Sequence, residues 1–172
     1  ACEQWLRIFG HGSGLSWTVL RPFATYGSGH RPSLDQGIVN VLLTQLLNGD
    51  RIIVKGSLMR CRDLTYVEDM ASAIVQMLFF KEGIGRVFNI GSGVAVTIKD
   101  IINLLCDALD KPISDVEIVE ETGTVGDPFS NVADITQIKK TLNFKPKFGL
   151  EAGLKELIAQ RMMSKGKAMD LK

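Results

Sequence analysis

The sequence predicts an α/β fold built on parallel strands, and two observations lead to that class. Short β-like runs alternate with longer stretches of helical hydrophobic period along the 172 residues. Helices that intervene between strands are the usual crossover connections of a parallel sheet. The hydrophobic content of 45% suffices for a packed core, and no repeat, low-complexity segment or linker divides the sequence.

The first fifth of the chain begins within a predicted helix. Residues 1–9 place apolar side chains at helical spacing, without an initiating Met or an N-cap residue, so we interpret the chain as cut from a longer one. The glycines of residues 10–14 are expected to break that helix. Residues 15–22 have the pattern of a buried strand closed by Pro22, and residues 23–37, rich in Gly, Pro and Ser, are expected to form a loop.

The middle of the chain predicts two further helices and two strands. Residues 38–49 have a helical apolar pattern with a terminal glycine as its stop, and residues 50–56 resemble a short strand. Helix Val67–Lys81 is expected to be capped by Asp69, and a second buried strand at 85–93 ends in glycines. The predicted buried face of this helix holds Met70, Ala73, Ile74, Met77 and Leu78.

The last part of the chain predicts a well-capped helix at Thr97–Leu109. Thr97 followed by Asp100 resembles a capping box, with Asp in place of the more usual Glu. The remaining expected elements are a strand at 116–120, a loop at 121–131, a short helix at 133–144, a helix at Leu150–Met163 and a frayed tail at 164–172. Residues 1–163 are therefore expected to form the folded part of the chain.

Charge and cysteine content restrict the class of partner. A net charge of +1 argues against broad binding of nucleic acid or of anionic membranes, so any anion site must be local. The three cysteines are far apart and lack a CxxC pair, so we predict neither disulfides nor a metal site and expect a reducing, cytoplasmic setting. No apolar run is long enough for a membrane span, and no signal peptide is recognisable.

The two histidines do not suggest catalysis. His11 and His30 both lie in predicted glycine-containing loops, and no partner spacing supports a Ser-His-Asp triad or a His-ligated metal. We interpret both as solvated loop positions and predict no catalytic residue within these 172 residues.

Two arginines stand immediately before a short β-like run and offer a local anion site. The planar guanidinium of Arg62 provides a fork that matches phosphate oxygens. The alternative, equally favoured by spacing, is an ion pair of Arg62 with Asp63 or Asp69 that only orders the turn. Arg60 is either a second phosphate contact or a solvated charge.

Two further patterns allow a ligand contact but favour a plain turn. The glycines of "NIGSG" at 89–93 could bring backbone N–H groups to a phosphate, yet their spacing is not GxGxxG, and such glycines more often only form the turn. Asp127 could accept hydrogen bonds from a ribose, but an Asp before Pro128 more often forms an Asx turn.

Four segments, taken in order, resemble the C-terminal half of NAD-dependent epimerase/dehydratases, which are extended short-chain dehydrogenase/reductases that act mostly on nucleotide sugars. The segments are "VLRPFATYGSG", "GDRIIVKGSLMRCRDLTYVEDMASAI", "VFNIGSGVAVTIKDI" and "GDPFSNVADITQIKKTLNFKPKFGLEAGL". The resemblance extends to about Ile158. It implies the last strands of a Rossmann-like sheet together with the small substrate-binding domain.

The resemblance also implies cofactor, substrate and partner. The cofactor would be NAD or NADP, and the substrate a UDP-, dTDP-, GDP- or CDP-linked sugar. Members of the family carry a glycine-rich dinucleotide turn and a catalytic Tyr-x-x-x-Lys, and neither motif occurs in this sequence. The start "ACEQW" is similar to the segment that follows the catalytic Lys, so the chain by itself is expected to be inactive.

Residue roles follow from the same resemblance. Pro22 and Phe23 match a strand end whose backbone lies near the nicotinamide. Ile53 and Lys55 match the strand whose backbone contacts the base, and Arg62 matches the diphosphate-binding arginine. Asp127 matches an acid that contacts the ribose in some members, and the helix at residues 1–9 matches one that packs in a homodimer.

Two departures from the family pattern leave other functions open. Ala24 stands where the family often has Asn, and Thr124 stands where many members have Arg. Each change removes a polar contact to a sugar nucleotide, worth about 1–3 kcal/mol where a charged hydrogen bond is involved. The alternatives are an oxidoreductase of the same superfamily with a substrate that carries no nucleotide, and a non-catalytic binding module.

Overall fold

A computed structural model describes residues 1–169, with side chains described as far as Met163. The helices and strands, in chain order, are α1 (Cys2–Ser13), β1 (Val19–Pro22), β2 (Ala24–Tyr26), α2 (Ile38–Asn48), β3 (Arg51–Lys55), β4 (Cys61–Arg62), β5 (Leu64–Tyr66), α3 (Val67–Leu78), β6 (Val87–Ile90), β7 (Val96–Thr97), α4 (Ile98–Ala108), β8 (Glu117–Glu121), β9 (Ser130–Asn131), α5 (Thr136–Leu142) and α6 (Leu150–Met169).

The strands pair mainly in parallel, as the alternation of strands and helices predicts. β1 pairs with β6, β2 with β5 and β3 with β8, all three in parallel register. The two-residue strand β4 lies between β7, which is antiparallel to it, and β9, which is parallel to it. Each parallel pair joins segments far apart in sequence, so helices connect them.

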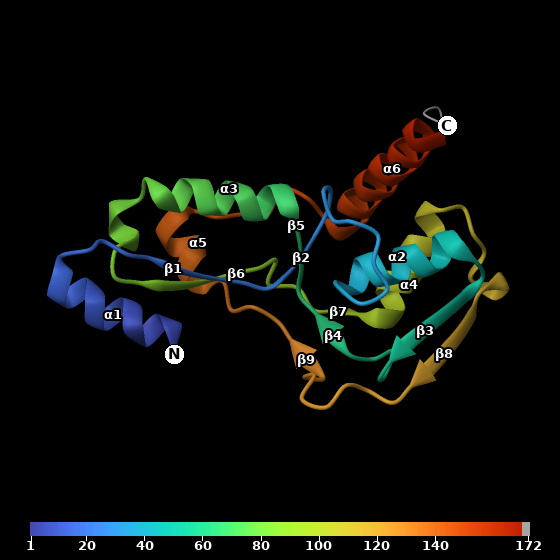
Figure 1. Ribbon diagram of the computed structural model, residues 1–172, viewed down its shortest axis with the longest axis horizontal. Helices are drawn as coiled ribbons and strands as arrows, with labels where there is room; N and C mark the ends of the chain where they lie inside the picture. The colour runs from blue at the N-terminus through green and yellow to red at the C-terminus, as the bar shows by residue number, and fades with distance from the viewer. Residues whose placement is uncertain (170–172) are drawn as a thin grey trace.

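The elements form two groups, each with its own apolar core (Figure 1). In one group, α3 and α5 lie beside the β1–β6 pair, and Met70, Phe88 and Ile138 are buried between them. In the other, α2, α4 and α6 cover β3 and β5 around Leu43, Ile101 and other buried side chains. Helix α1 lies at one end of the molecule, and none of its side chains is buried.

Buried carboxylates fasten the strand segment β4–β5 and the start of α3 to the neighbouring loops. Asp63, 1% exposed, accepts hydrogen bonds from the backbone N–H groups of Ser92 (2.6 Å), Gly93 (2.9 Å) and Ala133 (3.1 Å). Asp69 accepts from the backbone N–H groups of Lys147 (2.9 Å) and Phe148 (3.0 Å). The predicted cap role of Asp69 is therefore wrong: the N-cap position is Tyr66, and the carboxylate of Asp69 holds the segment that leads into α6.

Several element boundaries differ from the sequence prediction. Helix α1 continues through the expected break to Ser13 and ends where Gly14 adopts the left-handed conformation (φ 69°). The predicted buried strand at 15–22 is confined to Val19–Pro22, and the last two of these residues are exposed. Strand β2 lies at the start of the segment 23–37, which was expected to be entirely loop.

Helix α3 is shorter than predicted, and its apolar face is only partly covered. It ends at Leu78, and Met70, Ala73 and Met77 are buried while Ile74 and Leu78 are 42% and 74% exposed. Helix α4 has the predicted capping box, with Asp100 N–H donating to the Thr97 hydroxyl at 3.0 Å. Helix α6 extends to Met169, and residues 170–172 of the predicted tail lie outside the described residues.

Candidate functional site

A cleft of about 610 Å³ lies between the start of α2, the strand β3, the segment after it and the loop that precedes β9. Its polar lining includes Lys55, Arg60, Arg62, Thr124 and Asp127. The segment 38–62 and the loop before β9, far apart in sequence, thus meet around one cleft because β3 pairs with β8 and β4 pairs with β9.

The two arginines of the motif "RCR" converge on a single carboxylate. Arg62 donates from Nη2 to Oδ1 of Asp127 at 2.6 Å, and its Nη1 donates to the backbone carbonyls of Cys61 (2.7 Å) and Pro128 (2.9 Å). Arg60 forms an ion pair with Oδ2 of the same Asp127 and donates to the carbonyl of Lys55. Arg60 and Arg62 share Asp127 as their ion-pair partner, although Asp35 and Glu121 also line the cleft. Another anion could take the place of the Asp127 carboxylate on these guanidiniums.

The burial of Arg60 depends on a glycine. Gly56 has a positive φ of 89°, and a methyl group there would lie 2.9 Å from Cζ of Arg60. The absent side chain lets the guanidinium lie flat against the backbone that follows β3, and Arg60 is only 8% exposed as a result. The prediction of a solvated charge at this position is wrong.

The free edge of β3 is occupied by a side-chain amide from α2. The backbone N–H of Ile53 donates to Oε1 of Gln45 at 2.7 Å, and Nε2 of Gln45 donates to the Ile53 carbonyl at 3.2 Å. The amide group thereby satisfies the backbone donor and acceptor of Ile53, the residue predicted to contact the base. Sequence reasoning missed Gln45, whose half-buried position on a helix gives no local signal.

The structure brings together most, but not all, of the predicted substrate residues. Ile53, Lys55, Arg62 and Asp127 line the cleft. Ala24 does not: it is paired with Leu64 within β2–β5 and packs against the apolar core. Its departure from the family pattern therefore leaves the lining of this cleft unchanged.

Geometry excludes the local ion pairs that were the alternative for Arg62. Arg62 pairs with Asp127 and not with Asp63 or Asp69, whose carboxylates accept backbone hydrogen bonds. The carboxylate of Asp127 is turned to the arginines, while its backbone N–H donates to the Thr124 carbonyl in a turn.

The glycine segment after β6 donates hydrogen bonds to a carboxylate of the same chain. Its Ser92 and Gly93 N–H groups donate to the Asp63 carboxylate, which supports the turn interpretation of "NIGSG" over a phosphate contact.

The predicted cofactor-contacting residues lie apart from this cleft. Pro22 ends β1 opposite Ile90 of β6, and the Phe23 N–H donates to the Ile90 carbonyl at 2.9 Å. They stand at the carboxyl end of a parallel strand pair, the edge at which α/β sheets bind ligands.

Among the described residues, no helix is long and apolar enough to cross a membrane. No group of three or more His, Cys, Asp or Glu side chains in that part of the chain is placed to hold a metal ion.

Comparison with known proteins identifies the family. The model of the NAD dependent epimerase/dehydratase family matches residues 1–91, more than half of the chain, and the chain belongs to this family. A relative from Bacillus cytotoxicus, UDP-N-acetyl-alpha-D-glucosaminuronate decarboxylase, is 30% identical over 149 residues, which are 84% of this chain and 46% of that protein. The chain spans about half the length of the curated relatives it matches.

Solved structures confirm the fold predicted from sequence. UDP-glucose 4-epimerase from Thermotoga maritima, solved with UDP-glucose, is 30% identical with a TM-score of 0.87, over 95% of this chain and 51% of that one. UDP-glucuronic acid 4-epimerase from Bacillus cereus, in complex with UDP-glucuronic acid and NAD, is 26% identical with a TM-score of 0.85, over 94% and 50% of the two chains. The chain is therefore one half of a Rossmann-like extended short-chain dehydrogenase/reductase fold.

Proposed function

We propose that this chain binds the nucleotide diphosphate part of a nucleotide sugar, as part of an NAD-dependent epimerase or dehydratase. One observation carries the proposal: Arg60 and Arg62 converge on Asp127 in a cleft that also contains Ile53 and Lys55. The similar Thermotoga maritima and Bacillus cereus enzymes were solved with UDP-sugars.

The residues act by binding and positioning. A diphosphate entering the cleft would take the place of the Asp127 carboxylate on the Arg62 fork, because phosphate oxygens match the guanidinium better than one carboxylate oxygen. Asp127 would then turn to the ribose hydroxyls, and a base would replace the Gln45 amide at Ile53. Binding energy gathered in this way holds the sugar in position for reaction.

The sugar chemistry depends on groups outside these 172 residues. The chain has two tyrosines, Tyr26 and Tyr66; both are buried, and neither has a Lys four positions later. NAD or NADP would supply a hydride acceptor when bound. Pro22 and Phe23 fit a contact at the edge of that cofactor, since they end a parallel strand pair, but they do not form a dinucleotide-binding turn.

The cleft favours a nucleotide substrate over one without a nucleotide. Thr124 supplies no cation, but Arg60 and Arg62 both reach into the cleft and compensate for the missing charge. A substrate lacking phosphate would bring no new anion to the two buried or half-buried guanidiniums, which share Asp127 as their ion-pair partner.

We also infer a homodimer formed through α1 and a reducing, cytoplasmic setting. Helix α1 exposes Trp5, Ile8 and Phe9, each at 59% or more, and Glu3 pairs with Arg21 to hold the helix against β1. A second copy would cover this apolar face. The three cysteines are free, which agrees with a reducing compartment.

Calorimetric titration with UDP tests the proposed function. Arg62→Ala should raise the Kd at least about tenfold, since a charged hydrogen bond contributes roughly 1.5–3 kcal/mol. Arg51→Gln, which removes an exposed charge on β3 away from the cleft lining, is the matched control and should leave the Kd within about twofold. An Arg62→Ala variant that binds UDP as the parent does would refute the proposal.

A further inference from the structure

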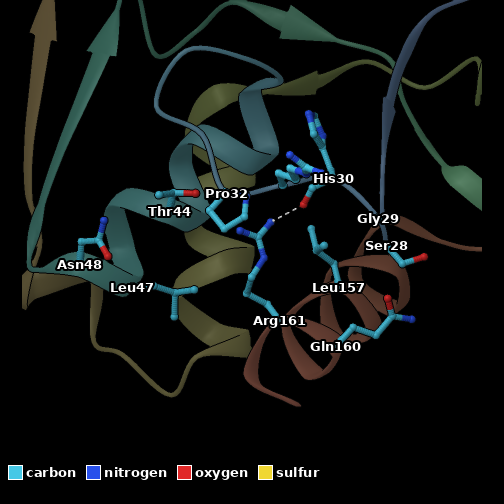
Figure 2. Close-up of a pocket in the computed structure, with 11 residues that line it drawn as sticks. Ser28, Gly29, His30, Pro32, Thr44, Leu47, Asn48, Leu157, Gln160 and Arg161 are labelled. Atoms are coloured by element: carbon cyan, nitrogen blue, oxygen red, sulfur yellow. Dashed lines mark hydrogen bonds between the residues drawn. The ribbon is translucent and has the colours of Figure 1, made fainter. Parts of the chain in front are cut away.

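A second pocket of about 410 Å³ lies between α2 and α6, on a different side of α2 from the cleft (Figure 2). The cleft uses Ile38, Val41 and Gln45 of α2, whereas this pocket uses Thr44 and Leu47. Its facing wall is the irregular segment 28–32, and its floor is α6. The proposed nucleotide site does not use this pocket.

The pocket contains an arginine that has no carboxylate partner in the part of the chain that the structure describes. Arg161 is 7% exposed, and its Nη2 donates to the His30 carbonyl at 3.1 Å and to Oδ1 of Asn40 at 2.7 Å. Its Nη1 has no hydrogen-bond partner among the described residues. Burial lowers the pKa of this guanidinium below its ordinary value, because no neighbouring anion offsets the loss of water.

A second buried polar atom belongs to a residue that lines the same pocket. The hydroxyl of Thr44, a residue 9% exposed, also has no partner within the described part of the chain. Figure 2 shows this hydroxyl and the Arg161 guanidinium pointing toward each other from α2 and α6. Two unsatisfied donors at one site are unusual, because buried polar groups are nearly always paired.

The lining determines which ligand would satisfy both donors. Its described side chains include Arg31 and Arg161 but no acidic residue, so the pocket is suited to an anion. The nearest acid on α6, Glu156, accepts a hydrogen bond from Gln160 at 2.7 Å. Pro32, Leu47 and Leu157 supply an apolar wall. A single water occupies about 30 Å³ and so would leave most of the space unfilled.

We propose that this pocket binds a small organic carboxylate. One carboxylate oxygen accepts from Nη1 of Arg161, the other accepts from the Thr44 hydroxyl, and the apolar part of the ligand packs on Leu47 and Leu157. Entry requires a small outward shift of segment 28–32, which has no regular secondary structure.

The probe is butyrate, titrated by calorimetry into the protein that contains this chain, in the absence of nucleotide. Butyramide has nearly the same shape without the charge and serves as the matched ligand. Saturable binding of butyrate but not of butyramide is the expected result. Equal binding of the two, or no saturable heat with butyrate, would overturn the proposal.

Three variants locate the site. Thr44→Val keeps the side-chain shape and should weaken butyrate binding about tenfold, as Arg161→Gln should. Arg51→Gln removes an exposed charge elsewhere and should change the Kd by less than about twofold. Should Arg161→Gln fail to fold, Thr44→Val alone decides: unchanged binding in that variant contradicts the assigned site.

Discussion

The carboxamide of Gln45 makes both hydrogen bonds that the free edge of Ile53 offers, one at 2.7 Å and one at 3.2 Å. A base that binds the same edge must displace this side chain. Under the proposed function, Gln45 thus occupies the position of the base, and Asp127 occupies the position of the phosphate.

Replacing Gln45 is expected to tighten binding of UDP. Gln45→Ala removes the competing amide and leaves the Ile53 backbone groups open, so the Kd should fall roughly two- to fivefold, less than one full hydrogen bond. Calorimetric titration measures this Kd. Gln76→Ala on α3 is the control, because the Gln76 amide donates a hydrogen bond to the Ser72 hydroxyl, on a helix that does not line the cleft. Weaker binding in Gln45→Ala would mean that the amide contacts the nucleotide itself.

The buried carboxylate of Asp63 should be essential for stability. Asp63→Asn replaces one acceptor oxygen by a donor that faces the N–H groups of Ser92, Gly93 and Ala133, so at least one of them loses its partner. We expect a loss of about 2–4 kcal/mol in the free energy of unfolding. Urea denaturation gives this value, and the exposed Asp107→Asn should stay within about 0.5 kcal/mol of the parent. A comparably small loss in Asp63→Asn would contradict the role given to the carboxylate.

Close packing at Gly153 should outweigh helix propensity. A methyl group there would lie 2.9 Å from Cζ of Tyr26 and 3.0 Å from Cδ2 of Tyr66. Gly153→Ala should therefore destabilise the fold by about 1–3 kcal/mol, although Ala favours helix formation. In α1, Gly12 has no atom within 4 Å of the same position, so Gly12→Ala should stabilise the protein. Thermal unfolding of the two variants decides, and a shift in the same direction for both would refute the packing argument.

Stability should fall at alkaline pH because Tyr26 is buried. Desolvation raises the pKa of its hydroxyl, with smaller contributions from Tyr66 and Asp69. The folded pKa exceeds the unfolded one, so the contribution is complete below the unfolded value and is lost as the pH rises above about 10. The free energy of unfolding should fall there by up to about 1.4 kcal/mol per pH unit for this group. Tyr26→Phe should show a shallower decline, and an identical slope would show that another group is responsible.

The sequence predicted elements best where local signals and burial agree. Thr97 and Asp100 form the expected capping box, and the helix behind them has its apolar face buried as its period indicates. Strand β2 was missed because its three residues precede a Gly-rich segment that dominates the local pattern. Ile74 and Leu78 have the spacing of a buried face but lie at an open surface of α3, which only the tertiary arrangement reveals.

The candidate site was predictable only in part, because it too depends on the tertiary arrangement. The guanidinium fork of Arg62 follows from its residue type. Its partner Asp127 was predicted separately, as a ribose contact. That the two form an ion pair depends on β4 pairing with β9, which brings positions 65 residues apart into contact. The buried residues Thr44 and Arg161 could not be predicted from the sequence as site residues, because neither stands in a motif.

The exchange of Asp127 for phosphate can be separated from its contact with ribose by two ligands. Asp127→Asn weakens the internal competitor for Arg60 and Arg62, so inorganic pyrophosphate, which has no ribose, should bind more tightly by about threefold to tenfold. UDP should gain less, because the neutral amide is a poorer acceptor for the ribose hydroxyls. Calorimetric titrations of both ligands give the ratio of the two Kd values, and this ratio should move in favour of pyrophosphate in the variant. Equal gains for the two ligands would show that Asp127 does not contact the ribose, and weaker pyrophosphate binding would show that it holds the arginines in place for the phosphate instead of competing with it.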